Sequence, residues 1–223
     1  MTKSYADPSW EKTFASRPFG KYPSEEAIRF FFASKAQIKP NSAALDIGCG
    51  AGAVTWFLAR QGVQVTAMDG APSALKQMEA TLKDFGCSPV VSVLGDITHP
   101  TDHVKGPFDI LVDHYSLYSN PAELVSKALA EYRELISPDG RFLSCMFGKR
   151  CTGVNDGVWL NSNTVKDIPS GVHKETGAIS LWTPVEAETL FRSHGFSTTY
   201  QEVQIHDRAG ILVEKLIFHL ATR

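Results

Sequence analysis

Three closely spaced glycines in the segment Leu45–Gly52, LDIGCGAG, constrain the fold of this chain more than any other feature. The segment follows a short apolar run and opens a stretch with a helical pattern. Glycine permits a tight turn there and lets backbone N–H groups approach a ligand closely. The N-terminus of the following helix favours anionic groups. The segment therefore predicts a strand–turn–helix unit that binds a nucleotide-like ligand, although some turns of this kind are only structural.

Strand-like and helix-like segments alternate along most of the 223 residues. Apolar runs predict seven strands, at residues 43–47, 63–68, 89–94, 108–112, 141–147, 198–205 and 212–221. Helical patterns lie at residues 24–38, 53–60 and 72–85. We predict one α/β domain over residues 1–223, with a doubly wound, mostly parallel sheet and helices on both faces. The last two strands are expected to add an antiparallel hairpin at the C-terminal edge.

Local signals mark two further helix starts and one turn. In Asn120-Pro121-Ala122-Glu123, the asparagine is expected to cap a helix whose first residue is the proline. Thr183-Pro184-Val185-Glu186 has the pattern of a capping box. Ser137-Pro138-Asp139-Gly140 predicts a turn before the fifth strand.

Acidic residues follow the second and third predicted strands. Asp69 lies 21 residues after Gly48, where a carboxylate can accept hydrogen bonds from both hydroxyls of a ribose. Asp96 follows the third strand and could accept from the exocyclic amine of an adenine. Either acid alone is commonly structural. A glycine turn and two acids at three successive strand ends together predict an adenosine-type ligand.

This ordered set resembles the class I S-adenosylmethionine-dependent methyltransferases. LDIGCGAGAVTWFLA is similar to the glycine motif of that family, AMDGAPSAL to its acidic second-strand motif and VLGDI to its third. The likeness continues through FDILVDHYSLYSN and LISPDGRFLS and covers residues 43–147. The resemblance implies a Rossmann-like fold, S-adenosylmethionine as cofactor and S-adenosylhomocysteine as product.

The same resemblance implies roles for individual residues. Gly48, Gly50 and Gly52 would face the methionine and ribose, and Asp69 would bind the ribose. Asp46 would help to hold the methionine end, whereas Asp96 and Ile97 would contact the adenine. The other cofactor-binding candidates implied by the motifs are Cys49, Gly70, Ala71 and Asp113.

Two segments outside these motifs are expected to cover the site. FGKYPSEEAIRFF resembles the opening of small bacterial methyltransferases, so residues 1–40 are expected to cover the cofactor, with Tyr22 near its methionine end. The aromatic residues of this segment could instead pack a helix onto the sheet. Residues 148–180 hold five glycines and little apolar periodicity, which predicts an insertion that could serve as a lid.

Methyl transfer from a sulfonium needs alignment and exclusion of water, and it needs a base only when the acceptor is protonated. His114 and Tyr115 follow the fourth strand and are the candidate catalytic residues, although His114 could simply close that strand. Methyltransferases that act on nucleic-acid amines carry an Asn/Asp-Pro-Pro-aromatic run at this place. The sequence here is Asp113-His114-Tyr115-Ser116, so we expect a small-molecule acceptor and no nucleic acid.

Two other functions stay open. Gly48, Gly50 and Ala53 also fit the GxGxxA pattern of an NAD(P)-dependent oxidoreductase, and Asp69 has the matching offset. Two observations count against the oxidoreductase. Asp46 lies just before the glycines, where the strand of a dinucleotide fold is usually apolar, and about 40 residues precede this strand, with which such a fold often starts. A methyltransferase-like module that binds the cofactor without turnover is the third possibility.

Composition excludes several classes of protein. Lys plus Arg number 22 and Asp plus Glu 24, so the net charge is −2 and no basic excess favours nucleic acid. The cysteines form no CxxC pair and the histidines show no ligand spacing, so we assign no metal. No segment has the apolar length of a signal core or a membrane span. We therefore expect free thiols, no membrane contact and a cytoplasmic location.

Overall fold

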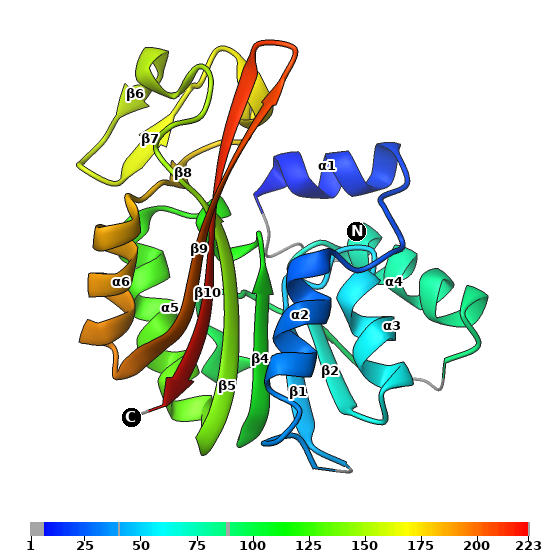
Figure 1. Cartoon of the computed structure of the whole chain (residues 1–223). Coiled ribbons are helices and arrows are strands. Elements are labelled where there is room, and N and C mark those ends of the chain that lie inside the picture. Colours follow the sequence, from blue (N-terminus) through cyan, green and yellow to red (C-terminus); the bar gives the residue numbers. More distant parts are fainter. Residues whose placement is uncertain (1–6, 40, 88–89, 223) are drawn as a thin grey trace.

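Figure 1 shows the computed structural model of the chain, which describes residues 7–39, 41–87 and 90–222. A seven-stranded sheet with the order β3-β2-β1-β4-β5-β10-β9 forms its centre. The strands are β1 (Ala43–Ile47), β2 (Gln64–Asp69), β3 (Val91–Leu94), β4 (Phe108–His114), β5 (Ile136–Phe147), β9 (Phe196–Arg208) and β10 (Ile211–Thr222). β1 to β5 are parallel, whereas β10 is antiparallel to β5 and β9. The strand order reverses between β1 and β4, the place where open α/β sheets bind ligands.

Helices cover both faces of this sheet, with α2, α3 and α4 on one side and α5 and α6 on the other (Figure 1). The helices are α1 (Pro8–Ser16), α2 (Glu25–Ala33), α3 (Ala53–Arg60), α4 (Pro72–Asp84), α5 (Ala122–Leu135) and α6 (Pro184–Ser193). Alternation along β4 builds the two cores: Ile110 and Val112 pack with α2 and α3, and Leu111 packs with α5 and α6. None of the helices in the described ranges has the length and apolarity needed to cross a membrane.

The predicted fold class and C-terminal hairpin are confirmed, and the capping box at Thr183 is formed. The strand predicted at 89–94 begins at Val91, and Pro89 lies outside the described residues. The helix predicted at 24–38 ends at Ala33, because the backbone from Ser34 to Gln37 forms turns. The turn predicted at residues 137–140 is a bulge within β5, where the pairing with β4 skips several residues.

The start of α5 differs from the prediction. Asn120 does not cap the helix, because its side-chain amide donates to the carbonyl oxygen of Leu117 at 3.2 Å. Pro121 occupies the cap position and offers no side-chain acceptor. The hydroxyl of Thr164, from the segment 148–180, accepts instead from the N–H of Ala122 at 3.0 Å. A residue distant in sequence thus satisfies the free donor of this helix.

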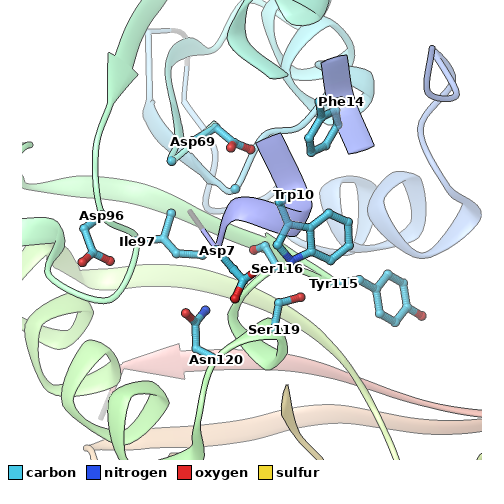
Figure 2. Close-up of a pocket in the computed structure, with 12 residues that line it drawn as sticks. Asp7, Trp10, Phe14, Asp69, Asp96, Ile97, Tyr115, Ser116, Ser119 and Asn120 are labelled. Carbon is cyan, nitrogen blue, oxygen red and sulfur yellow. The ribbon is translucent and has the colours of Figure 1, made fainter. Parts of the chain in front are cut away.

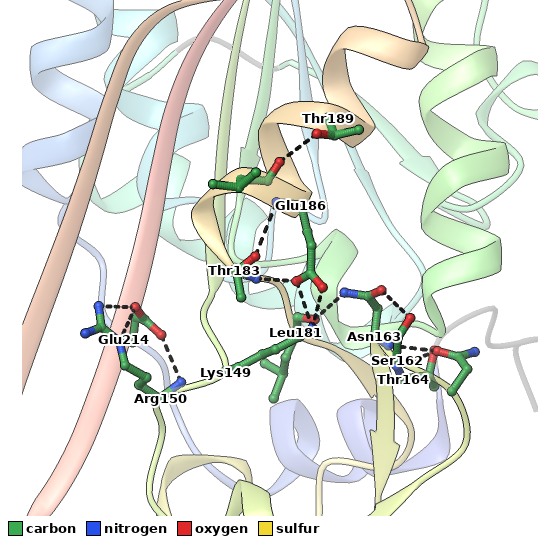
Figure 3. A network of polar contacts seen from close by, with 12 residues as sticks. Lys149, Arg150, Ser162, Asn163, Thr164, Leu181, Thr183, Glu186, Thr189 and Glu214 are labelled. Carbon is green, nitrogen blue, oxygen red and sulfur yellow. Dashed lines mark hydrogen bonds and ion pairs between the residues drawn. The ribbon is translucent and has the colours of Figure 1, made fainter.

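The segment 148–180 packs closely against the rest of the molecule. It contains a small antiparallel sheet of β6 (Val158–Trp159), β7 (Thr164–Lys166) and β8 (Ile179–Ser180). Val154, Val165 and Ile168 join the core formed by α5, α6 and the main sheet. At its start, Arg150 pairs with the buried Glu214 of β10, with Nε 2.8 Å from Oε1 (Figure 3). The segment therefore contacts the rest of the molecule at several points. Its role as a lid stays a prediction.

Candidate active site

A cleft lies at the switch point, beside the carboxyl ends of β1, β2 and β4 (Figure 2). It encloses about 600 Å³, part of which is open to solvent. The lining residues come from the glycine turn, the strand ends and α1: Asp7, Trp10, Phe14, Gly48, Asp69, Gly70, Asp96, Ile97, Tyr115, Ser116, Ser119 and Asn120. The motifs that are separated in the sequence therefore meet in one pocket.

The glycine turn is as tight as its spacing predicts. Gly48, Gly50 and Gly52 have φ values of 63°, 53° and 81°. A Cβ atom at Gly48 would lie 2.3 Å from Cβ of Ser116, and one at Gly52 would lie 2.6 Å from Cγ of Met78. The backbone therefore comes closer to its neighbours than any side chain would allow.

Asp69 ends β2 and joins the glycine turn to the start of α4. Its Oδ2 accepts from the N–H of Gly50 at 2.9 Å, and its Oδ1 accepts from the N–H of Ala71 at 2.8 Å. Burial raises the pKa of Asp69, and these backbone hydrogen bonds offset only part of that rise. Each carboxylate oxygen can accept a further hydrogen bond, so the group can also serve a ligand in the pocket.

Asp96 and Ile97 form the wall that follows β3. Oδ1 of Asp96 accepts from the N–H and the hydroxyl of Thr98 at 2.8 and 2.7 Å. Burial raises the pKa of Asp96, but the hydrogen bonds from Thr98 and His99 outweigh it and leave the pKa below its usual value. The hydroxyl of Tyr132 donates to the carbonyl oxygen of Ile97 at 2.7 Å and fixes this turn.

Asp46 and Asp113 lie behind the pocket and do not line it. Asp46 is 2% exposed and accepts from the hydroxyl of Thr55 at 2.6 Å. Burial raises the pKa of Asp46 to about 7 despite that hydrogen bond, and nearby acids add to the rise. Asp113 is fully buried and accepts from the N–H groups of Ser116 and Leu117, each at 3.0 Å. Asp46 thus ties β1 to α3, and Asp113 holds the turn that follows β4.

The chain turns sharply after β4. Tyr115 has a φ of 59°, which is uncommon for a residue other than glycine. It lines the pocket, whereas His114 does not. Within the described residues, the phenol oxygen of Tyr115 and Nε2 of His114 are buried without a hydrogen-bond partner. Burial lowers the pKa of His114 to about 4 and raises that of Tyr115, so both groups are neutral near pH 7.

Helix α1 lies over the pocket and rests on α4 (Figures 1 and 2). The carboxylate of Glu11 accepts from the N–H and the hydroxyl of Ser73 at 3.1 and 2.6 Å. The side-chain amide of Gln77 donates to the carbonyl oxygens of Phe14 and Arg17 at 2.6 and 2.9 Å. These contacts place the aromatic side chains of α1 against the glycine turn.

The pocket brings together six of the fourteen predicted site residues. Those that line it are Gly48, Asp69, Gly70, Asp96, Ile97 and Tyr115. Gly50, Gly52, Cys49 and Ala71 form the turns around it, and the Cys49 side chain packs in the small core that α4 covers. Sequence reasoning missed Asp7, Ser116, Ser119 and Asn120, whose positions depend on α1 and on the 3-10 turn after β4.

Tyr22 lies away from the pocket, contrary to expectation. The residue is 76% exposed, and its ring contacts the ring of Phe85, with centroids 5.6 Å apart. Phe85 follows the C-terminal end of α4, whereas the N-terminal end of that helix faces the pocket. Thirteen helical residues, about 20 Å, separate the two ends. Tyr22 is therefore not retained as a candidate site residue.

The pocket lining fits S-adenosylmethionine better than a dinucleotide. Three carboxylates line it, from Asp7, Asp69 and Asp96, and among the described residues no lysine, arginine or histidine lines it. The phosphates of NAD(P) would meet like charge there. S-adenosylmethionine carries a sulfonium and an ammonium group against one carboxylate, so its net charge is opposite to that of the lining. In the described residues, no group of three or more His, Cys, Asp or Glu side chains could hold a metal ion.

The fold and the pocket are those expected of a class I S-adenosylmethionine-dependent methyltransferase domain. The chain matches the methyltransferase domain family over residues 38–189, about two thirds of its length. The chain belongs to that family, and the predicted family is thereby confirmed.

Two relatives with stated activities match only part of this chain. The probable cobalt-precorrin-6B C(15)-methyltransferase of Methanobrevibacter smithii is 32% identical over 74 residues, 33% of this chain and 40% of that protein. The ubiquinone biosynthesis O-methyltransferase of Xylella fastidiosa is 25% identical over 153 residues, 66% of this chain and 58% of that protein. The matches thus span about half the length of these relatives.

Solved structures show the same fold at low identity. The N-methyltransferase NodS of Bradyrhizobium japonicum, in complex with S-adenosylhomocysteine, has a TM-score of 0.68 at 17% identity and covers 99% of both chains. The 1,6-didemethyltoxoflavin-N1-methyltransferase of Burkholderia thailandensis has a TM-score of 0.63 at 19% identity, with coverage of 89% and 78%.

Proposed function

We propose that this protein transfers the methyl group of S-adenosylmethionine to a small-molecule acceptor. The observation that carries the proposal is the juxtaposition of the glycine turn with Asp69 and Asp96 in one pocket, whose charged lining residues in the described ranges are all acidic. Asp69 matches what a ribose requires, Asp96 matches what an adenine amine requires, and the acidic lining suits a cationic sulfur centre. The family match over residues 38–189 supports the same activity.

Most of the residues that line the pocket would bind the cofactor and align it with the acceptor. Asp69 would take the ribose hydroxyls, and Asp96 and Ile97 would contact the adenine. The backbone at Gly48 would meet the methionine portion, because that glycine brings the main chain to the pocket surface. The bound cofactor supplies a methyl group on sulfur whose leaving group is a neutral thioether, so the protein's task is alignment and exclusion of water.

His114 and Tyr115 are proposed to act on the acceptor. Protonated Tyr115, which lines the pocket, can donate a hydrogen bond to the acceptor, and neutral His114 would take up a proton only from an acceptor that reaches beyond this lining. Both have a buried polar atom without a partner in the described residues, and native proteins rarely leave such atoms unpaired without a reason. Burial dominates the lowered pKa of His114, and the charges of Glu26 and Lys215 act in opposite directions, since Glu26 raises the pKa and Lys215 lowers it.

A small-molecule acceptor is favoured by the low net charge of −2 and by the acidic character of the charged side chains that line the pocket in the described part of the chain. The toxoflavin-precursor methyltransferase, whose structure holds its small acceptor, shares the fold over 89% of this chain. The relative from Xylella fastidiosa is named as an O-methyltransferase. These likenesses support the class of acceptor and leave the atom that is methylated open.

Replacing Asp69 tests the proposed cofactor site. Asp69→Ala should weaken binding of S-adenosylhomocysteine by about 1–3 kcal/mol, because hydrogen bonds from a buried polar ligand are lost. Isothermal titration calorimetry measures the change, and Asp84→Ala, an exposed acid at the far end of α4, is the matched control. Unfolding in urea checks that the variant is folded. Unchanged affinity in folded Asp69→Ala would remove the ribose assignment.

A further inference from the structure

Helix α1 presents an unusual set of side chains to the pocket. Its N-cap residue Asp7 contributes a carboxylate, and Trp10 and Phe14 contribute aromatic rings (Figure 2). The two ring centroids lie 6.2 Å apart, and the edge of Phe14 approaches the backbone of Gly50 in the glycine turn. Aromatic faces together with a carboxylate are the groups that proteins use to bind onium cations.

The carboxylate of Asp7 is the least committed of the three in the pocket. Asp69 is held by two backbone N–H groups, and Asp96 by Thr98 and His99. Asp7 accepts one hydrogen bond, from the N–H of Ser9 at 2.8 Å to Oδ1, and in the described part of the chain no cation pairs with it. It lies exposed at the rim of the pocket. A cationic ligand would supply the missing partner.

Trp10 adds an independent sign of a ligand. Its indole nitrogen is buried and has no hydrogen-bond partner among the described residues. A buried N–H without an acceptor costs free energy in a closed protein core. Such a group is expected where a bound ligand supplies the acceptor. This donor belongs to the same side chain whose ring lines the pocket.

The attachment of α1 is weak enough to respond to a ligand. None of its residues is fully buried. It is held by hydrogen bonds from Ser73 and Gln77 of α4 and by its aromatic contacts. Elements with few buried apolar contacts open locally at low free-energy cost. The position of α1 can therefore be coupled to the occupant of the pocket.

We propose that α1 is a charge-sensing strap that recognises the sulfonium of the cofactor through Asp7, Trp10 and Phe14. This inference rests on the proposed function and deepens it. The sulfonium is present in S-adenosylmethionine and absent from S-adenosylhomocysteine, which is a neutral thioether at that position. The strap would thus close more firmly on the substrate form and loosen on the product form, which favours product release after each transfer.

Paired binding measurements test this proposal. Calorimetric titrations with S-adenosylmethionine and with S-adenosylhomocysteine give the affinity ratio of wild type, Asp7→Asn and Trp10→Leu. We expect each substitution to weaken S-adenosylmethionine about fivefold and S-adenosylhomocysteine less than twofold. Glu11→Gln is the matched control: it lies on the same helix but bonds Ser73, so it should weaken both ligands equally. Hydrogen exchange of residues 8–16 should slow more with the sulfonium ligand.

The outcomes separate this proposal from the proposed function. Equal losses for both ligands in Asp7→Asn and Trp10→Leu, or no loss, would overturn the charge-sensing role while leaving the cofactor site intact. Equal protection of residues 8–16 by both ligands would overturn it as well. If wild type bound neither compound, the proposed function itself would fail.

Discussion

Gly52 and Gly62 share a left-handed backbone but differ in their surroundings. Their φ values are 81° and 82°. A Cβ at Gly52 would lie 2.6 Å from Cγ of Met78, whereas nothing lies within 4 Å of one at Gly62. Gly62→Ala should cost about 1–2 kcal/mol of unfolding free energy through backbone strain alone. Gly52→Ala should cost about 1–3 kcal/mol more through overpacking. Urea denaturation of both variants measures the difference, and equal losses would contradict the steric account.

Residue-scale prediction succeeded where the signal is local. Gly48, Asp69 and Asp96 could be placed because each follows a short apolar strand, and parallel strand ends meet at one edge of a sheet. Asp7 could not be placed, because its position depends on α1 docking onto α4 through Glu11 and Gln77. An aromatic residue such as Tyr22 can pack on any apolar surface, so its type did not reveal its neighbour.

At the scale of elements, the first turn of α6 should make stability sensitive to acid. Glu186 accepts from the N–H of Thr183 at 2.7 Å and pairs with Lys149 at 2.7 Å (Figure 3). Burial raises the pKa of Glu186, but these partners outweigh it and lower the pKa to about 2 from an ordinary value of 4.5. Because its pKa is lower in the folded state than in the unfolded state, Glu186 stabilises the folded protein above pH 4.5. This contribution to the free energy of unfolding is lost as the pH falls toward 2.

Glu186→Gln tests that dependence. Because the side chain is 38% exposed, the variant should lose less than about 1 kcal/mol at pH 7. The gap between wild type and variant should narrow between pH 4.5 and pH 2 in urea denaturation. Glu188→Gln, on the exposed face of the same helix, is the control. A gap that stayed constant from pH 7 to pH 2 would show that the charge of Glu186 contributes nothing.

Elements were predictable in proportion to how much their own sequence specifies them. β1 and α3 follow from an apolar run and a helical period, and the capping box of α6 from four residues. The start of α5 was not predictable from its own sequence, because Thr164 caps it from another part of the chain. The two- and three-residue strands of the segment 148–180 carry too short a pattern to be recognised.

At the scale of the whole molecule, α1 and the segment 148–180 differ in how they are attached. The segment 148–180 sends Val165 and Ile179 into the core, and it caps α5, which follows the pocket residues Ser119 and Asn120. The helix α1 buries no residue fully and is held by polar contacts with α4. The segment 148–180 is therefore firmly attached to the core, whereas α1 is not. In the described residues, the charged side chains that line the pocket are all acidic.

The measurement that tests the central claim most directly is calorimetric titration of the wild-type protein with S-adenosylhomocysteine and, in parallel, with NADH. The three lining carboxylates and the tight glycine turn predict micromolar binding of S-adenosylhomocysteine and no binding of NADH. Binding of NADH without binding of S-adenosylhomocysteine would contradict the account, because the same turn and the same Asp69 would then serve a dinucleotide.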